Sequence, residues 1–248
     1  MRRDAAEVLF LPGFDGSGAL REPFLAALGE FMASRAVDLR QPRAIDYPNR
    51  PLHSLNGYCR HALALATPDR PLVLVAESFS GLVAARWASM DPHVEALVLC
   101  GSFARNPMTW ATSLAASVPS VVRFGAGFLA PPPGNRDPMR IRWSRELART
   151  LRALDEAVIG ERLRLIATED LRPELRALAI PVVLVQFEDD FVVGARARGE
   201  LEEVCHNAQV VRFPGPHFAI ETMPRECAEA IGPRLRTITT TRAITGSP

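Results

Sequence analysis

The sequence predicts an α/β protein with a doubly wound, mainly parallel sheet of about six strands and a helical lid inserted before the penultimate strand. Three observations predict this fold. Short runs rich in Val and Leu alternate with helical patterns, and several of these runs are apolar at consecutive positions, as in strands covered on both faces. One long stretch between two of the runs contains no strand. The 248 residues, 48% of them hydrophobic, suffice for one large domain, or one domain with an insert.

Strands and helices are predicted in alternation along the chain. The expected strands are residues 7–11, 43–47, 71–76, 94–100, 180–187 and 208–213. The expected helices are residues 20–33, 53–66, 80–90, 195–206 and 217–236. This order of elements is typical of βαβ units and a parallel sheet.

The alternation is interrupted once, before the fifth strand. There the chain has helical patterns at 138–160 and 161–168 and is far longer than the connections usual in α/β units. We therefore divide the chain into an α/β core of residues 1–103 and 178–236, a helical lid insert of residues 104–177, and a flexible C-terminal tail of residues 237–248.

Composition and charge exclude several functions. A net charge of +1 gives no indication of a nucleic-acid or membrane partner. All 29 basic residues are arginine, which excludes a P-loop lysine, a Schiff-base lysine and a pyridoxal anchor. The four cysteines (Cys59, Cys100, Cys205 and Cys227) form no CxxC pair and are expected to be free thiols, not metal ligands. With no signal-peptide core and no apolar run of the length that spans a bilayer, the expected location is cytoplasmic.

A candidate nucleophile lies in residues 71–81, PLVLVAESFSG. Ser78 stands between a buried strand and a helix, with the small residues Ala76 and Ser80 two positions away on either side. Small neighbours are what a tight nucleophile elbow requires, and the following helix N-terminus favours a developing negative charge. The alternative is a polar turn in which a serine only caps the next helix.

A serine hydroxyl needs a base, and the base needs an acid to orient it. His217 follows the last predicted strand and the turn PGP, at the sheet edge where open α/β folds assemble their sites. The other four histidines are expected at the surface or at helix ends. The acid is expected after the fifth strand, in EDDFVV, where Asp190 is favoured and Asp189 and Glu188 remain alternatives.

Two backbone N–H groups are candidates for an oxyanion hole. The first predicted strand runs into the glycine-rich turn LPGFDGSG (11–18), where the N–H of Phe14 is favoured. The second donor is the N–H of Phe79, directly after the nucleophile. The alternative is a phosphate-binding turn, but the spacing G-x-x-G-x-G is not that of dinucleotide sites.

Taken together, LPGFDGSG, AESFSG, EDDFVV and GPHFAIETMPRE resemble the landmarks of α/β-hydrolase-fold serine hydrolases, in the same chain order. The LPGxDGxG loop is similar to that of a branch of small bacterial esterases and thioesterases, and to plant plastid acyltransferases of the same fold. The resemblance implies Ser78 as nucleophile, His217 as base, Asp190 as orienting acid, and Phe14 and Phe79 as oxyanion donors. It also implies that the protein uses no metal and no organic cofactor.

The resemblance further implies hydrolysis of an ester or thioester. The apolar residues of the predicted lid favour a medium-sized, mainly apolar acyl or alkyl group, and a basic run after the prolines at 131–133 leaves open that this group is bound to an acidic carrier. We expect Asp15 of the oxyanion loop and Trp110, Phe124 and Phe128 of the lid to contact this substrate. Two other functions remain open on the same residues: an acyltransferase that passes the acyl group to an alcohol, and a ligand-binding receptor without turnover. The oligomeric state is not indicated by the sequence.

Overall fold

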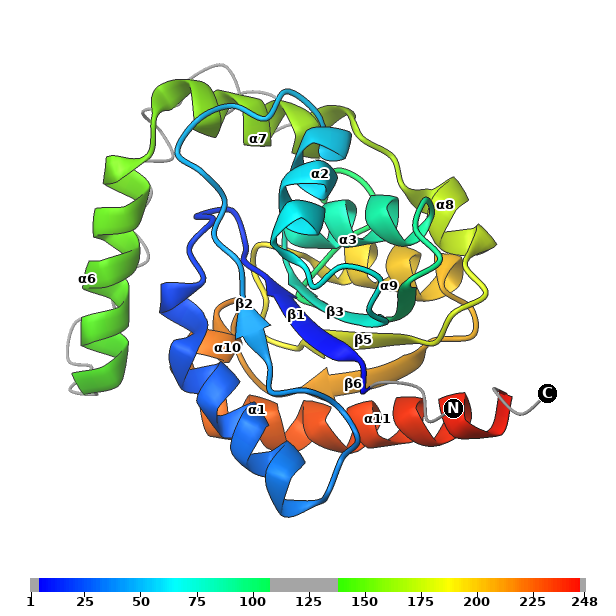
Figure 1. Cartoon of the computed structure of the whole chain (residues 1–248). Coiled ribbons are helices and arrows are strands. Elements are labelled where there is room, and N and C mark those ends of the chain that lie inside the picture. Colours follow the sequence, from blue (N-terminus) through cyan, green and yellow to red (C-terminus); the bar gives the residue numbers. More distant parts are fainter. Residues whose placement is uncertain (1–4, 108–137, 246–248) are drawn as a thin grey trace.

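The computed structural model describes residues 5–107 and 138–245, which contain a six-stranded, all-parallel sheet between two layers of helices (Figure 1). The strands are β1 (Glu7–Leu11), β2 (Arg43–Ala44), β3 (Leu72–Glu77), β4 (Val94–Cys100), β5 (Val182–Phe187) and β6 (Gln209–Phe213). Their order in the sheet is β2-β1-β3-β4-β5-β6. The predicted fold class is therefore confirmed, and β3, which leads into Ser78, lies in the middle of the sheet.

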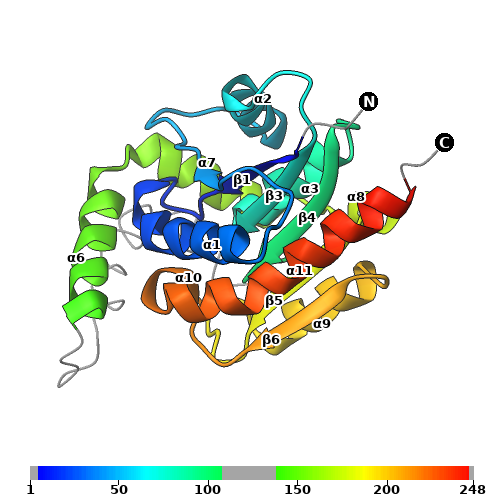
Figure 2. The same cartoon turned by 60° about the horizontal axis from the view of Figure 1, so that its bottom comes forward.

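Two sets of helices cover the two faces of the sheet. One face carries α1 (Glu22–Ser34) and α11 (Pro224–Thr245), which lie side by side in Figure 2. The other face carries α2 (Leu55–Leu65), α3 (Ser80–Ala88) and α9 (Ala195–Val204).

The buried strands have an apolar side chain on each face in turn. On β1, Val8 and Phe10 pack in the cluster beneath α1 and α11, whereas Leu9 and Leu11 pack in the cluster beneath α2 and α3. Successive side chains of a strand point to opposite faces, so a sheet covered on both sides requires consecutive apolar residues. This is the physical basis of the uninterrupted Val and Leu runs in the sequence.

Three helices occupy the described part of the predicted insert: α6 (Pro138–Ala153), α7 (Glu156–Thr168) and α8 (Arg172–Ala177). Asp155 separates α6 from α7, because its side chain accepts a hydrogen bond from the N–H of Ala157 at 2.7 Å and caps α7. In Figure 1, α6 and α7 (green) lie beyond the carboxyl ends of the strands, where the candidate site residues are found. The predicted substrate contacts Trp110, Phe124 and Phe128 lie outside the described residues.

The second strand is shorter than predicted. The prediction was 43–47, but β2 ends at Ala44. After one further hydrogen bond to the sheet, from Ile45 N to Phe10 O at 3.1 Å, the chain turns toward the oxyanion loop, where Tyr47 N donates to Gly16 O at 2.9 Å. The apolar residues of this segment are thus used to support a loop instead of extending an edge strand.

The C-terminal helix is longer than predicted. The prediction placed a flexible tail at 237–248, but α11 continues to Thr245. Ile238 is buried in the same cluster as Leu235, so tertiary packing holds the helix beyond the point where its sequence loses helical periodicity.

The four cysteines are free, as predicted, and all four are buried. In the ranges that the structure describes, no helix combines the length and the apolar character needed to cross a membrane.

Candidate active site

Ser78 occupies a strained turn between β3 and α3. Its backbone φ is +51°, in the left-handed region that side chains other than glycine rarely adopt, at a cost of about 1–3 kcal/mol. Hydrogen bonds on both sides of the residue maintain this conformation: Ser78 N donates to Cys100 O at 2.9 Å, and Ser78 O accepts from Gly81 N at 3.0 Å. This is the geometry of a nucleophile elbow, in which the hydroxyl is raised above the end of the strand.

The elbow leaves no room for larger neighbours. A Cβ atom added to Gly81 would lie 1.6 Å from Oγ of Ser102, which itself donates to Ser78 O at 2.9 Å. Ser80, where many elbows have glycine, is fully buried. Its Oγ donates to the carbonyl of Pro12 and lies 2.8 Å from the hydroxyl of Tyr47, so this serine links the elbow to the start of the oxyanion loop.

His217 connects Ser78 to Asp190. Its Nε2 lies 3.0 Å from Ser78 Oγ, and its Nδ1 lies 2.7 Å from Asp190 Oδ2. A carboxylate can only accept, so Nδ1 carries the ring proton and Nε2 is left free to accept the serine proton. All three residues are buried, and His217 is only 3% exposed.

Asp190 is itself held in place by backbone donors. Its Oδ1 accepts from Val192 N at 2.8 Å and from Val193 N at 2.7 Å, which leaves Oδ2 aimed at the imidazole. The two alternative acids, Asp189 and Glu188, have exposed side chains. The structure therefore brings Asp190, and neither of its neighbours, into contact with His217.

The oxyanion loop follows β1. Gly16 has a φ of +76°, and its N–H donates to Gly13 O at 3.1 Å, which closes a tight turn around Phe14. Among the described residues, no hydrogen-bond acceptor is found for the N–H of Phe14 or for that of Phe79. Two backbone donors without acceptors, one in the loop after β1 and one directly after the candidate nucleophile, are the groups that an oxyanion hole needs.

Arg162 attaches the loop to helix α7. This fully buried arginine donates through Nη1 to the carbonyl oxygen of Phe14 at 2.5 Å and through Nε to the hydroxyl of Tyr58 at 3.1 Å. Its guanidinium also lies over the ring of Tyr47, 5.6 Å from the centroid. The sequence analysis did not identify this residue.

A second buried arginine, Arg21, lies among three carboxylates, those of Asp15, Glu77 and Glu221, at 2.7, 2.7 and 2.9 Å respectively. Burial alone would lower the pKa of Arg21, but its acidic neighbours, Asp15 and Glu77 before Glu221, raise it well above its usual value. Asp15, predicted as a substrate contact, is buried and hydrogen-bonded to Arg21 and to Ser17 N, so it has a role inside the loop, and its contact with substrate stays a prediction.

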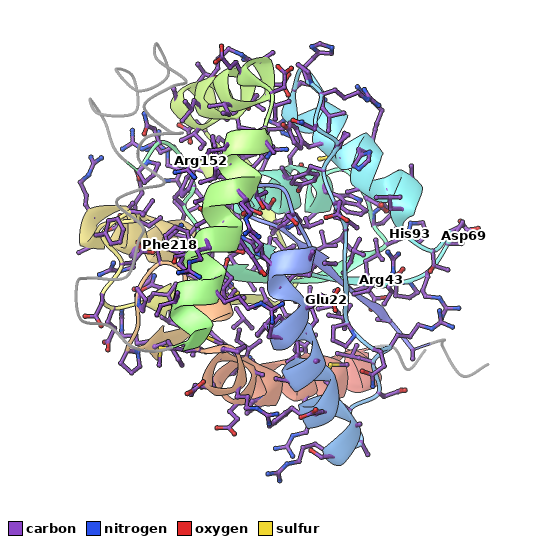
Figure 3. The ribbon with its side chains drawn as sticks, turned by 90° about the vertical axis from the view of Figure 1, so that its left-hand side faces the viewer. Glu22, Arg43, Asp69, His93, Arg152 and Phe218 are labelled. Atoms are coloured by element: carbon purple, nitrogen blue, oxygen red, sulfur yellow. The ribbon has the colours of Figure 1, made fainter. Side chains whose placement is uncertain are left out.

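Apolar side chains of α6 reach the histidine side of the site. The ring centroids of Trp143 and Phe218 are 4.9 Å apart, and those of Phe218 and His217 are 5.0 Å apart. Figure 3 shows Phe218 beside α6. The cluster that contains Trp143 and Leu147 also packs against Phe14, so it borders both the base and the oxyanion loop.

Within residues 5–107 and 138–245, no group of three or more His, Cys, Asp or Glu side chains is placed to hold a metal ion.

A parallel α/β sheet whose carboxyl edge presents a hydrogen-bonded serine, histidine and aspartate, in the chain order Ser, Asp, His, has the architecture of the α/β hydrolases. The model of the "Alpha/beta hydrolase family" matches residues 8–230, and the chain belongs to this family. Comparison with curated proteins gave no match.

Solved structures with the same fold cover nearly the whole chain. An enol-lactonase from Burkholderia xenovorans superposes with a TM-score of 0.73 at 15% identity, over 95% of this chain and 92% of that one. A bromoperoxidase from Bacillus anthracis gives 0.72 at 18% identity, over 92% and 91%. An esterase from Rhodococcus sp. gives 0.69 at 19% identity, over 94% and 91%. At these identities the likeness establishes the fold.

Proposed function

We propose that the protein is a carboxylic ester hydrolase, a carboxylesterase or thioesterase, that acts through an acyl-enzyme on Ser78. The observation on which this proposal rests is the continuous chain from Ser78 Oγ through His217 to Asp190, at 3.0 and 2.7 Å. A hydroxyl, a base and an orienting acid in this order are the groups that acyl transfer needs.

The proposed reaction has two halves. In the first, His217 Nε2 takes the proton of Ser78 as Oγ bonds to the ester carbonyl carbon, and the N–H groups of Phe14 and Phe79 bind the resulting oxyanion. The imidazolium then protonates the leaving oxygen or sulfur, whose bond to carbon breaks. In the second half, His217 deprotonates a water that attacks the acyl-enzyme, and the proton returns to Ser78 as the acid leaves. These steps use only groups of the chain and water.

The substrate class follows from the surroundings of the imidazole. Trp143, Leu147 and Phe218 present apolar surface beside His217 and Phe14, which suits a medium-sized apolar acyl or alkyl group. The lactonase and esterase among the similar structures are consistent with ester chemistry on this fold.

The test is covalent labelling of Ser78. Intact-mass spectrometry should detect one fluorophosphonate adduct on the native protein and none on Ser78→Ala, with the heat-unfolded protein as the control for nonspecific reaction. A panel of p-nitrophenyl esters and acyl-CoAs then gives the chain length and leaving group. An unlabelled native protein would reject the proposal.

Two measurements separate hydrolysis from the alternatives on the same site. With an alcohol acceptor present, a hydrolase should release free acid, whereas ester formation would indicate an acyltransferase. Tight ligand binding that survives Ser78→Ala, without turnover, would indicate a receptor.

A further inference from the structure

The charged cluster around Arg21 is buried directly behind the candidate site. The guanidinium is 1% exposed, and it presents a different nitrogen to each carboxylate: Nη1 to Asp15, Nε to Glu77 and Nη2 to Glu221. The carboxylate side chains are at most 4% exposed. Burial of so many ionisable groups is unfavourable unless each has a partner, so the arrangement depends on Arg21.

Each of these carboxylates belongs to a segment that also bears a group of the proposed mechanism. Asp15 directly follows Phe14, and Glu77 directly precedes Ser78. Glu221 lies on α10 (Ala219–Thr222), one helical turn beyond the base. One side chain of the η1 turn (Ala19–Arg21) thus contacts three segments that are far apart in the sequence.

The backbone is adapted to this contact. A Cβ atom added to Gly13 would lie 3.2 Å from Arg21 Nη2 and 3.2 Å from Glu77 Oε1, closer than ordinary packing allows. Glycine at 13 therefore lets the oxyanion loop lie against the Arg21–Glu77 pair.

The protonation of Glu221 limits the negative charge of the cluster. Burial, and next to it the charge of Glu77, raises the pKa of Glu221 well above its usual range, which favours the protonated form of this carboxyl. Arg21 forms charge-assisted hydrogen bonds with Asp15 and Glu77, both at 2.7 Å, and faces Glu221 on its third side at 2.9 Å.

We propose that Arg21 is a positioning residue that fixes the Phe14 N–H and the Ser78 hydroxyl relative to each other and to the imidazole. The inference rests on the proposed function, and it assigns to the cluster a part in the reaction beyond stability. Misplacement of reacting groups by about 1 Å can reduce a rate about 100-fold. A contact that ties the oxyanion loop to the elbow is therefore expected to act on kcat.

The chain offers a matched control for this inference. Glu77 is the last residue of β3, at the carboxyl ends of the strands. Glu7 is the first residue of the neighbouring strand β1, at the amino ends. Both are buried, and both accept a hydrogen bond at 2.7 Å from the Nε of an arginine, Arg21 for Glu77 and Arg43 for Glu7. Glu77→Gln and Glu7→Gln thus each remove the charge of a buried glutamate that is paired with an arginine. The arginine is 1% exposed in the first pair and 43% exposed in the second.

The experiment compares thermal stability, kcat and KM of these variants on the best p-nitrophenyl ester. For Glu77→Gln we expect kcat to fall about tenfold or more, with KM changed less than about threefold. Glu7→Gln should lose stability but keep kcat within about twofold. Asp15→Asn should repeat the fall in kcat and serves as the second variant if Glu77→Gln does not fold. Glu221→Gln, an isostere of the neutral acid, should keep kcat within about threefold.

The outcomes separate the two proposals. If Ser78 is labelled in the wild-type protein and folded Glu77→Gln or Asp15→Asn keeps wild-type kcat, the positioning role is rejected and the hydrolase stands. An equal fall in kcat for Glu7→Gln would likewise assign the cluster to stability alone. An unlabelled wild-type protein would reject the hydrolase and this inference with it.

Discussion

Arg162 donates a hydrogen bond from α7 to the carbonyl oxygen of Phe14, with the two atoms 2.5 Å apart. The residue whose N–H is proposed to bind the oxyanion is thereby connected, through its carbonyl group, to the insert between β4 and β5. Next to Arg162, Glu161 accepts from the N–H groups of Leu52 and His53, both in the segment before α2. Helix α7 is therefore part of the support of the candidate site.

Replacement of this arginine should affect both activity and stability. In Arg162→Met the Phe14 carbonyl loses its partner, so we expect unfolding free energy to fall by about 1–3 kcal/mol. We also expect kcat to fall about tenfold or more as the loop loses its fixed orientation. Urea unfolding and ester hydrolysis measure the two effects.

The control is Arg164→Met on the same helix. Arg164 donates to His53 O at 3.2 Å in an exposed position, so its loss should leave kcat within about twofold. Equal kcat values for the Arg162 and Arg164 variants would contradict the role of Arg162.

The acid can be tested with two neighbouring substitutions of the same type. Asp190→Asn should reduce kcat about 10⁴-fold, because the amide no longer selects the tautomer with Nε2 free. Asp189→Asn, whose side chain is exposed, should change kcat less than about twofold. Steady-state kinetics of both variants decide the point, and a larger loss for Asp189→Asn would refute the assignment.

The strain at Ser78 predicts a difference between two inactive variants. Removal of the hydroxyl should lower kcat about 10⁶-fold in either. Because φ at this position is +51°, Ser78→Gly should be more stable than Ser78→Ala by about 1 kcal/mol. Urea unfolding of the two variants measures this difference in unfolding free energy. Equal stabilities would show that the turn relaxes when the side chain is shortened.

The buried acid Glu221 predicts a pH dependence of stability. Burial raises its pKa in the folded protein above the ordinary value of 4.5, so its contribution to stability is fully present below that pH. The contribution is lost progressively as the pH rises from there toward the folded pKa, because the unfolded chain alone then gains by ionisation. Glu221→Gln has no proton to lose, so its stability relative to wild type should increase with pH. Urea unfolding from pH 4 to pH 8 tests this, and a constant difference would show that Glu221 ionises in the fold.

Much of the fold follows from the sequence because both faces of the sheet are buried. That condition produces strands with almost no polar positions, such as β3, in which only the last residue, Glu77, is polar, and these are easy to locate. The ends that were misplaced, after Ala44 and after residue 236, are set by contacts made elsewhere in the molecule: Tyr47 with the oxyanion loop, and Ile238 with the core. The local sequence pattern therefore does not predict where these two elements end.

The residues that react could be located because strand ends meet at one edge of a parallel sheet, whereas the supporting residues could not. With 29 basic residues, all arginine, nothing in the sequence distinguishes the buried Arg21 and Arg162 from those at the surface. One signal was present: Glu77 ends an otherwise apolar strand, and a carboxylate there requires a buried cation. The sequence does not say which arginine provides it.

The strand order has a consequence for how the protein gains activity as it folds. Phe14 follows β1, Ser78 follows β3, Asp190 follows β5 and His217 follows β6, so the groups come from strands that span most of the sheet. Pairing distant strands is the slow part of assembling such a topology. A refolding chain should therefore regain secondary structure first and catalytic activity last. The time at which activity returns would then report when β6 pairs with the rest of the sheet.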